Sequence, residues 1–412
     1  MSKGLRLDQF KEPAFSSDIL KINPQKIYIN SVLNSDTEDD FKFLFSLGTK
    51  IKKNDLIAIK QIDIYKYKNV NIFSPQDCEV KETKYLINDR DEATSFIILE
   101  STDDNSEEYK PDFDNEDEKF KNKEPVNISL EDLVNITYNA SVIDETDSAY
   151  LFQKIYDIKN NLYHNKIYID AIDDQPFTSS KESLLLHYPN AVNFAVQTLK
   201  KALNLNNIDI IFYDTESYNR ENKISKKCID TPVINLKVNY PVRHYISKKL
   251  NYDGYIGIQA ILHLARLLIN NSYKQTTTFV TISGPSVISP ANVEIPIGSS
   301  TKEITENFEL KAEPKQIILG QILTGLAISE EETPISVSTR SILIFSEHIS
   351  LKRMECIGCS KCSDVCPQNL LPSYRYKFKQ TGDVIFEEFS SEAKCIKCYC
   401  CSYICPSHIN LV

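Results

Sequence analysis

The amino-acid sequence predicts a multidomain α+β protein that ends in a small cysteine-rich domain. Its 412 residues correspond to two to four domains at the usual size of roughly 150 residues each. Short β-type runs fill residues 26–100, and strand and helix patterns alternate over residues 126–273. Nine of the 11 cysteines lie between Cys356 and Cys405. We therefore expect a β module, an α/β core, a second β segment and a metal-binding end made of short helices.

Residues 26–100 are predicted to form a small all-β module. The runs IYIN, FKFLF, LIAIKQI and SFIILE are rich in β-branched and aromatic residues. Turn-forming residues such as Gly48 and Asn54 separate them. Residues 1–25 have no clear period and are assigned to a separate N-terminal segment.

An acidic stretch, residues 101–125, follows the β module. Ten of the residues between Asp103 and Glu124 are Asp or Glu, and aliphatic residues are scarce there. Such a composition does not bury enough apolar surface to fold by itself. We predict a solvated linker; a docking strip for a basic partner is the alternative.

The α/β core is predicted over residues 126–273. Its expected strands are 166–172, 208–214 and 232–238, and its expected amphipathic helices are 191–203 and 256–269. A second β segment, residues 274–350, is predicted from the strand patterns at 278–284, 293–300 and 315–325. Residues 351–412 form the cysteine-rich domain.

The charge and hydropathy patterns exclude several classes of function. The formal net charge is -10, from 47 basic and 57 acidic side chains, which argues against a nucleic-acid partner. No apolar run approaches the length of a transmembrane helix, and the first residues lack the apolar stretch of a signal peptide. We expect a cytoplasmic protein.

The cysteine-rich end contains one pattern twice. CIGCSKCSDVCP and CIKCYCCSYICP both read C-x2-C-x2-C-x3-C-P, the spacing of bacterial two-cluster ferredoxins. In that arrangement three cysteines of one motif bind a 4Fe–4S cluster, and the fourth binds the neighbouring cluster. The predicted ligands are Cys356, Cys359, Cys362 and Cys405 for cluster 1, and Cys395, Cys398, Cys401 and Cys366 for cluster 2.

Two alternatives accompany this assignment. Zinc can bind four cysteines, although it favours two separated C-x2-C pairs. Cys400 lies between two predicted ligands, so it is either a bystander or a replacement for Cys401 in a shifted register.

The order of these parts resembles the C subunit of the Rnf ion-translocating electron-transport complex. The resemblance is strongest in CIGCSKCSDVCPQNLLP (356–372) and CIKCYCCSYICPSHINLV (395–412), and the extra Cys400 belongs to that family's second motif. Residues 47–59 with 71–80 are similar to the family's barrel-sandwich hybrid. Residues 280–300 are similar to its SLBB-like β-grasp segment. The resemblance also implies a Rossmann-like α/β core and a two-cluster ferredoxin-like end.

The family binds FMN and nicotinamide through a glycine-rich loop, and this sequence departs from that pattern. The corresponding stretch, residues 140–154, contains no glycine and places Asp144, Glu145 and Asp147 where a phosphate would lie. Carboxylates repel a phosphate, and side chains keep the backbone away from it. Two further family motifs are altered: AIDDQPF (171–177) has Gln175 in place of an acid, and YPVRHY (240–245) lacks the family's glycines and acid. We predict that the chain binds neither FMN nor NAD.

The resemblance implies an iron–sulfur electron-transfer subunit of a membrane-associated Rnf-like redox complex that couples electron transfer to ion translocation. The expected partners are the membrane subunits and a soluble electron donor or acceptor such as ferredoxin. The expected location is the inner face of the cell membrane. No catalytic side chain is predicted, because the clusters carry the chemistry. We expect the protein's own flavin and nicotinamide site to be lost. A nicotinamide-dependent flavin reductase and a redox-inactive scaffold are the alternatives, and Arg243 with His244 could instead form an anion pocket of new specificity.

Overall fold

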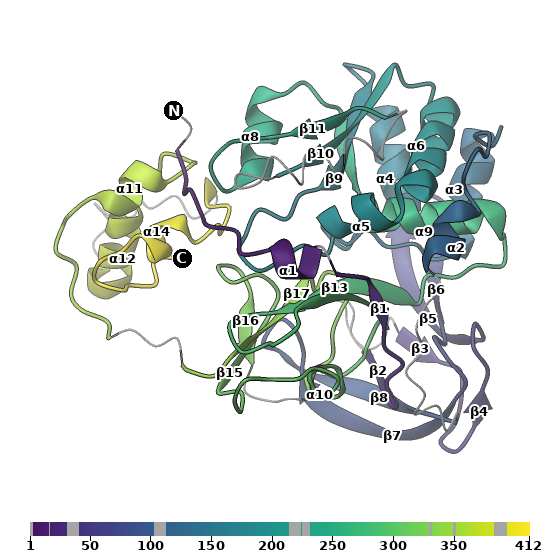
Figure 1. Cartoon of the computed structure of the whole chain (residues 1–412), viewed down its shortest axis with the longest axis horizontal. Coiled ribbons are helices and arrows are strands. Elements are labelled where there is room, and N and C mark those ends of the chain that lie inside the picture. Colours follow the sequence, from purple (N-terminus) through teal and green to yellow (C-terminus); the bar gives the residue numbers. More distant parts are fainter. Residues whose placement is uncertain are drawn as a thin grey trace.

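The protein is a mixed α/β multidomain structure with a cysteine-rich module at one side (Figure 1). The computed structural model describes residues 3–15, 17–30, 41–102, 113–213, 224, 231–328, 332–348, 352–382 and 394–412. Within these residues the strands form four sheets. None of the described helices has the length and apolar character needed to cross a membrane.

The first two sheets form the predicted β module. Their strands pair antiparallel. Alternate residues of a strand face the same side of its sheet. Ile27, Ile57 and Leu99 face a core shared by the two sheets, and they are completely buried there. The order in the four-stranded sheet is β2 (Lys26–Asn30), β8 (Ala93–Ser101), β7 (Cys78–Ile87), β4 (Lys50–Ile51), and in the three-stranded sheet β3 (Phe41–Phe43), β5 (Leu56–Ile64), β6 (Tyr67–Phe73).

The third sheet is parallel and carries helices on both faces. Ile167 and Ile169 of β9 pack against the large core on one face, whereas Tyr168, between them, packs with Val242 and Ile246 on the other. Strands buried on both faces read as continuous apolar runs, which is why the sequence revealed them. The strand order is β11 (Val233–Asn235), β10 (Asn207–Phe212), β9 (Lys166–Ala171), β12 (Gly254–Gly257), and the helices are α3 (Leu130–Asn139), α4 (Leu151–Asn160), α5 (Glu182–His187), α6 (Pro189–Leu203), α8 (Val242–Lys249) and α9 (Ile258–Ile269).

The fourth sheet has six strands and a core of its own. Val280, Val293 and Ile342 are fully buried in it, together with Ile304 of helix α10 (Thr301–Glu306). The strand order is β1 (Leu20–Lys21), β14 (Ala291–Pro296), β13 (Thr277–Ser283), β17 (Ser341–Phe345), β15 (Gln316–Leu319), β16 (Leu326–Ile328).

The N-terminal segment is part of the folded structure. Helix α1 (Glu12–Phe15) contacts β14, and β1 pairs parallel with β14. Lys11 and Glu182 are both buried, and Lys11 Nζ lies 2.8 Å from Glu182 Oε1. The segment therefore crosses from the α/β core to the six-stranded sheet (Figure 1).

The predicted acidic linker differs from expectation in its second half. Residues 103–112 lie outside the described part of the chain. Helix α2 (Phe113–Glu118) follows, and Phe120 is only 2% exposed. Asp117 Oδ1 accepts a hydrogen bond of 2.9 Å from the backbone N–H of Ala191, near the start of α6. Asp117 thus binds a backbone donor at the N-terminus of α6, and the buried Phe120 holds the segment against the core. The amino-acid composition of the stretch did not indicate either contact.

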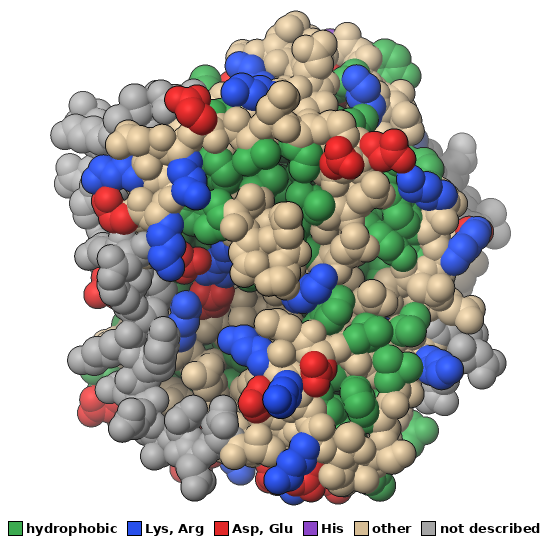
Figure 2. Space-filling view, turned by 90° about the vertical axis from the view of Figure 1, so that its right-hand side faces the viewer, with side chains coloured by type: hydrophobic (Ala, Val, Ile, Leu, Met, Phe, Trp, Pro, Cys, Tyr) green, Lys and Arg blue, Asp and Glu red, His purple; other side chains and the backbone are tan. Residues whose placement is uncertain are grey.

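The cysteine-rich module consists of short helices joined by loops. It contains α11 (Lys361–Val365), α12 (Pro372–Thr381) and α14 (Cys400–Tyr403). The molecular face turned away from this module mixes acidic and basic side chains with apolar ones (Figure 2).

Candidate iron-sulfur centre

The two cysteine motifs follow the same backbone path. In each motif the residues on both sides of the second cysteine have positive φ: Gly358 at 72° and Ser360 at 61° in the first, Lys397 at 50° and Tyr399 at 59° in the second. A short helix then begins in each motif, α11 or α14. Left-handed residues in a tight loop turn successive backbone N–H groups toward its concave side, which favours a negatively charged group there. The repeat in the sequence is therefore also a repeat in three dimensions.

One cavity brings together cysteines from both motifs. It is lined by Cys366 of the first motif and by Cys395, Cys398 and Cys401 of the second. The backbone N–H of Leu370 donates a hydrogen bond of 3.4 Å to Cys366 Sγ. These four cysteines are the set predicted for cluster 2, and they include the ligand expected to cross from the other motif.

The other predicted set lies beside the first. Cys356, Cys362 and Cys405 pack in one cluster of side chains, which also includes Cys401 of the neighbouring set. Cys359 is exposed. This arrangement supports two adjacent cysteine sets with one outward-facing member.

The donor chemistry of these sites fits an iron–sulfur cluster. All donors are thiols, and thiolates are the protein ligands of 4Fe–4S cubanes. Within the described part of the chain, no three His, Cys, Asp or Glu side chains converge as they would on a single metal ion. A cubane separates its four thiolates more widely than a single ion does, so loosely spaced cysteines around a cavity suit the larger group.

Cys400 has contacts of a different kind. It is completely buried, and its Sγ donates a weak hydrogen bond of 3.8 Å to the backbone carbonyl of Tyr240. It packs with Leu5 and Leu7 of the N-terminal segment. Although Cys400 also borders the cavity of the second set, these contacts favour a bystander that helps to dock the module.

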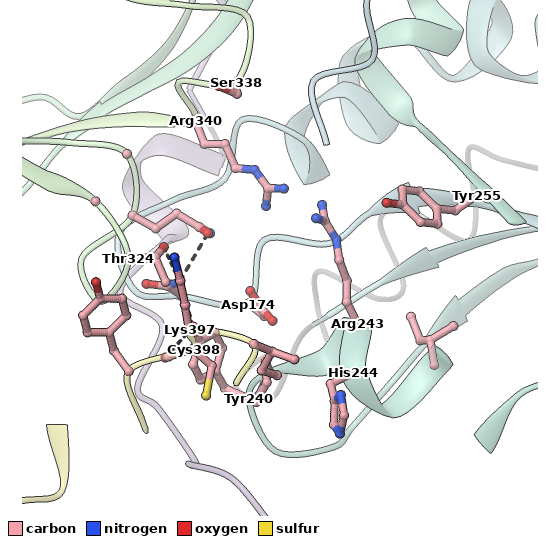
Figure 3. Close-up of a pocket in the computed structure, with 18 of the residues that line it drawn as sticks. Asp174, Tyr240, Arg243, His244, Tyr255, Thr324, Ser338, Arg340, Lys397 and Cys398 are labelled. Carbon is pink, nitrogen blue, oxygen red and sulfur yellow. Dashed lines mark hydrogen bonds between the residues drawn. The ribbon is translucent and has the colours of Figure 1, made fainter. Parts of the chain in front are cut away.

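Tyr240 connects the cysteine-rich module to the rest of the protein. Its hydroxyl donates a hydrogen bond of 3.0 Å to the carbonyl of Cys398 and accepts one of 3.1 Å from Gln175 Nε2. Gln175 Nε2 also lies 3.0 Å from Thr324 Oγ1, in the loop after β15 (Figure 3). Two altered positions, Gln175 and the YPVRHY segment, thus meet at a junction of three parts of the molecule.

The loop at residues 140–154 places its carboxylates at the start of helix α9. Glu145 accepts hydrogen bonds from the backbone N–H groups of Gln259 at 3.3 Å and Ala260 at 3.2 Å. Asp144 Oδ2 accepts one of 2.7 Å from Gly257. Helix N-termini attract anions, and here the anions belong to the chain itself.

Two lysines balance these buried carboxylates. Burial acts to raise the pKa of Asp144, but the charge of Lys154 and the N–H of Gly257 outweigh it and keep that pKa below its usual value. For Glu145 burial prevails and raises the pKa, although Lys181 Nζ lies 3.2 Å from its carboxylate. A phosphate in this place would have to displace a carboxylate that is already bonded.

A cavity of about 970 Å³ lies between the parallel sheet, the six-stranded sheet and the second cysteine motif. Arg243 and His244, both noted in the sequence, line it. Arg340 and Lys397 also line it, and no motif in the sequence indicated them. Arg340 stands in the ordinary polar stretch SVSTR, and only the fold brings it to the cavity.

Comparison with known proteins agrees with the cysteine chemistry. Residues 355–409 match the family described as a 4Fe–4S dicluster domain. The chain is 37% identical over 106 residues to the C subunit of the ion-translocating oxidoreductase complex of Edwardsiella ictaluri, and the match covers 24% of this chain and 13% of that protein. The protein of the same name from Buchnera aphidicola is 21% identical over 273 residues, covering 61% of this chain and 54% of that protein.

The chain is thus similar, over part of its length, to C subunits of ion-translocating oxidoreductase complexes. A further match, from Methanosarcina acetivorans, is 33% identical over 107 residues and covers 25% of this chain and 24% of its relative. The matched region of this chain thus spans between 13% and 54% of the length of these three relatives. The cysteine-rich end of the chain is a ferredoxin-like 4Fe–4S domain.

Solved structures give only distant likenesses. The NAD+-reducing [NiFe]-hydrogenase in its H2-reduced state matches with a TM-score of 0.42 and 11% identity over 53% of this chain and 47% of that one. Its air-oxidised state matches with a TM-score of 0.44 and 10% identity over 63% of this chain and 54% of that one. At these scores the likeness supports no conclusion about this chain.

Proposed function

We propose that the protein is the iron–sulfur electron-transfer subunit of a membrane-associated Rnf-type oxidoreductase complex. It would relay single electrons through two 4Fe–4S clusters in a complex that couples electron transfer to ion translocation. The observation that carries the proposal is the cavity in which Cys366 of one motif meets the cysteines of the other, including the three predicted as its partners in cluster 2. Such sharing of ligands keeps two clusters close together, as electron relay requires.

The chain's own residues hold and tune the clusters. When bound, the clusters would supply one-electron oxidation and reduction. The N–H of Leu370, which donates to Cys366 Sγ, would stabilise the negative charge on that thiolate. Cys401 adjoins both cysteine sets, so it would shorten the route between the clusters. No side-chain acid, base or nucleophile takes part in this function.

The partners in this proposal are the membrane subunits and a soluble electron donor or acceptor such as ferredoxin. Two apolar side chains beside the first motif support a docking surface there: Ile357 is 70% exposed and Met354 is 52% exposed. Exposed Cys359 belongs to the same loop. A partner seated on this loop would approach the first cysteine set, which would hold cluster 1. The proposed location is the inner face of the cell membrane.

The proposal includes the loss of the flavin and nicotinamide site. Its support is that Asp144 and Glu145 occupy the donors at the N-terminus of α9, where an anion would otherwise bind. We also propose that the β module is a barrel-sandwich hybrid, that the six-stranded sheet contains an SLBB-like β-grasp, and that the α/β core is Rossmann-like.

The first test is the composition of the anaerobically purified protein. We expect about eight iron atoms and eight acid-labile sulfides per chain, without stoichiometric flavin or zinc. One flavin per chain that is reduced by a nicotinamide would instead establish a flavin reductase. Zinc without sulfide would refute the cluster assignment.

Single substitutions test the sharing of ligands. Cys366→Ser and Cys401→Ser lie in different motifs, yet we expect both to remove the electron paramagnetic resonance signal of the same cluster. Cys362→Ser should affect the other cluster. Cys400→Ala is the matched control next to Cys401 and should keep both signals. Loss of different clusters in the first two variants would contradict the assignment.

A further inference from the structure

A second cavity, of about 420 Å³, lies where the β module meets the six-stranded sheet and the loop before α4. The β module contributes residues of β2, β6, β7 and β8 to its wall. The six-stranded sheet contributes residues 275–276, 297–298 and 334–338 from its loops, and the loop before α4 contributes residues between 141 and 150. A cavity of this volume is large enough to hold a small molecule.

The larger part of the cavity wall is apolar. Val70 and Phe96 of the β module and Ile335 of the six-stranded sheet line it, and each of these side chains is at most 3% exposed. Ile143 and Tyr150 add apolar surface from the loop before α4. A water molecule beside such a wall finds few hydrogen-bond partners, so the wall favours an apolar ligand.

The charged residues of this cavity lie together in one turn. They are Asp89, Arg90 and Glu92, between β7 and β8, and Arg90 and Glu92 are exposed. Asp89 accepts a hydrogen bond from Ser336 Oγ, and Glu92 Oε2 accepts one of 3.1 Å from Asn88 Nδ2. The other described residues of the wall are uncharged. A charged ligand would therefore find no counter-ion away from this turn, and its burial would be costly.

One polar side chain presents a donor to the cavity. Gln275 lines the cavity and is 8% exposed. Its Oε1 accepts a hydrogen bond of 2.5 Å from the backbone N–H of Ile143, and because an N–H group only donates, this bond fixes which end of the amide is the oxygen. Its Nε2 has no hydrogen-bond partner among the described residues. An acceptor oxygen on a ligand would supply that partner.

Hydrogen bonds hold the walls of the cavity together. The backbone N–H of Tyr28 donates a bond of 2.9 Å to the carbonyl of Gly298, which joins β2 to the loop after β14. Gly298 has a φ of 90°, and a Cβ there would overlap the carbonyl oxygen of Tyr28. The bond between Gln275 and Ile143 joins the six-stranded sheet to the loop before α4. A ligand would therefore enter a site that is already formed.

We propose that this cavity binds an uncharged, largely apolar small molecule whose carbonyl oxygen accepts a hydrogen bond from Gln275 Nε2. Burial of apolar surface supplies most of the affinity, and the amide fixes the orientation of the ligand. The cavity shares Asp89, Arg90 and Ser338 with the cavity of about 970 Å³, so the test has to separate the two. No described residue of either cysteine motif lines this site, and the proposal does not depend on electron relay.

Equilibrium dialysis of the full-length protein, purified anaerobically with its clusters, tests the proposal. The probes are methyl naphthyl ketone, ethylnaphthalene and naphthoate, which have nearly the same size. We expect the ketone to bind about fivefold more tightly than ethylnaphthalene, because only the ketone accepts a hydrogen bond from Gln275. Naphthoate should bind most weakly, because its charge would be buried in an apolar wall. Absence of binding for all three probes, equal binding of ketone and hydrocarbon, or tightest binding of naphthoate would overturn the proposal.

The variant Gln275→Met keeps the length of the side chain but lacks the donor. We expect it to bind the ketone and ethylnaphthalene equally, whereas a purely structural role of Gln275 would weaken both and keep the preference for the ketone. A retained preference would therefore overturn the proposal.

A pair of tryptophan substitutions places the probes in one of the two cavities. Thr276→Trp adds a large ring to the wall of the smaller cavity at a half-buried position, and we expect it to abolish binding of both uncharged probes. Leu326→Trp makes a similar addition in the larger cavity and should bind as the unmodified protein does. Circular dichroism checks that both variants are folded. Unchanged binding in Thr276→Trp, or loss of binding only in Leu326→Trp, would contradict the assignment.

Discussion

His263 is a buried base that makes the stability of the protein depend on pH. It is completely buried, and its Nδ1 lies 2.6 Å from Tyr273 Oη. Burial and the nearby charge of Arg266 lower its pKa from 6.5 to about 3, although Glu294 acts in the opposite direction. Below pH of about 6.5 the unfolded chain therefore binds a proton that the folded chain does not, and acid destabilises the fold.

As the pH falls from about 6.5 to 5, we expect this residue to lower the free energy of unfolding with a slope that steepens toward about 1.4 kcal/mol per pH unit. Scanning calorimetry over this range should show a melting temperature that falls with pH. The fall should be shallower in His263→Gln and unchanged in His408→Gln, whose side chain is exposed. Equal slopes in all three proteins would show that His263 is not the group responsible.

At the scale of single residues, sequence reasoning is most informative where spacing encodes geometry. The regular intervals within each cysteine motif predicted which side chains share a loop, and the structure places Cys366 beside the other motif as that pattern implies. Arg340 could not be predicted in this way. Its cavity exists only because distant segments meet, and no local period records such a meeting.

The helices and strands of the core were predictable because both faces of the parallel sheet are buried. Apolar runs at 166–172 and 208–214 became β9 and β10, and the periodic stretches at 191–203 and 256–269 became most of α6 and α9. Strand β12 was not predicted. Two of its four residues, Gly254 and Gly257, are glycines, which are uncommon in strands, and pairing with β9 makes this segment a strand.

The start of α9 depends on the absence of a side chain at Gly257. A Cβ there would overlap the carboxylate oxygens of Glu145. We expect Gly257→Ala to destabilise the protein by about 2 kcal/mol or more. The new methyl group would displace the buried carboxylate of Glu145, which would then lose its hydrogen bonds from the backbone N–H groups of α9. Chemical denaturation followed by circular dichroism measures this loss.

A double-mutant cycle identifies the cause. Glu145→Ala destabilises the protein by itself, since it removes the same hydrogen bonds. In the double variant Glu145→Ala with Gly257→Ala the two losses should be less than additive, because the space needed by the new methyl group has been vacated. Additive losses would indicate that Gly257 acts through its backbone and not through Glu145.

Across the whole molecule, the chain's first residues connect parts that are distant in sequence. Leu5 exchanges backbone hydrogen bonds with Tyr240, and β1 extends the six-stranded sheet. These connections were not predictable from the sequence. Short segments that pair with or pack against another element are too short to show a hydrophobic periodicity of their own. For the same reason the second half of the acidic stretch was expected to be solvated, whereas Asp117 and Phe120 fix it to the α/β core.

The docking of the ferredoxin-like domain should depend on the Tyr240 hydroxyl, which links Gln175 of the core to the carbonyl of Cys398. Tyr240→Phe keeps the ring but leaves the carbonyl and the amide without this partner, a loss of about 1–2 kcal/mol at the junction. We expect faster hydrogen–deuterium exchange in residues 394–401 and an unchanged rate in the β module, because only the contact between the parts is weakened. Tyr163→Phe is the control, since that side chain is 85% exposed. If exchange accelerates equally throughout the chain, Tyr240 supports the global fold and not the docking of this domain.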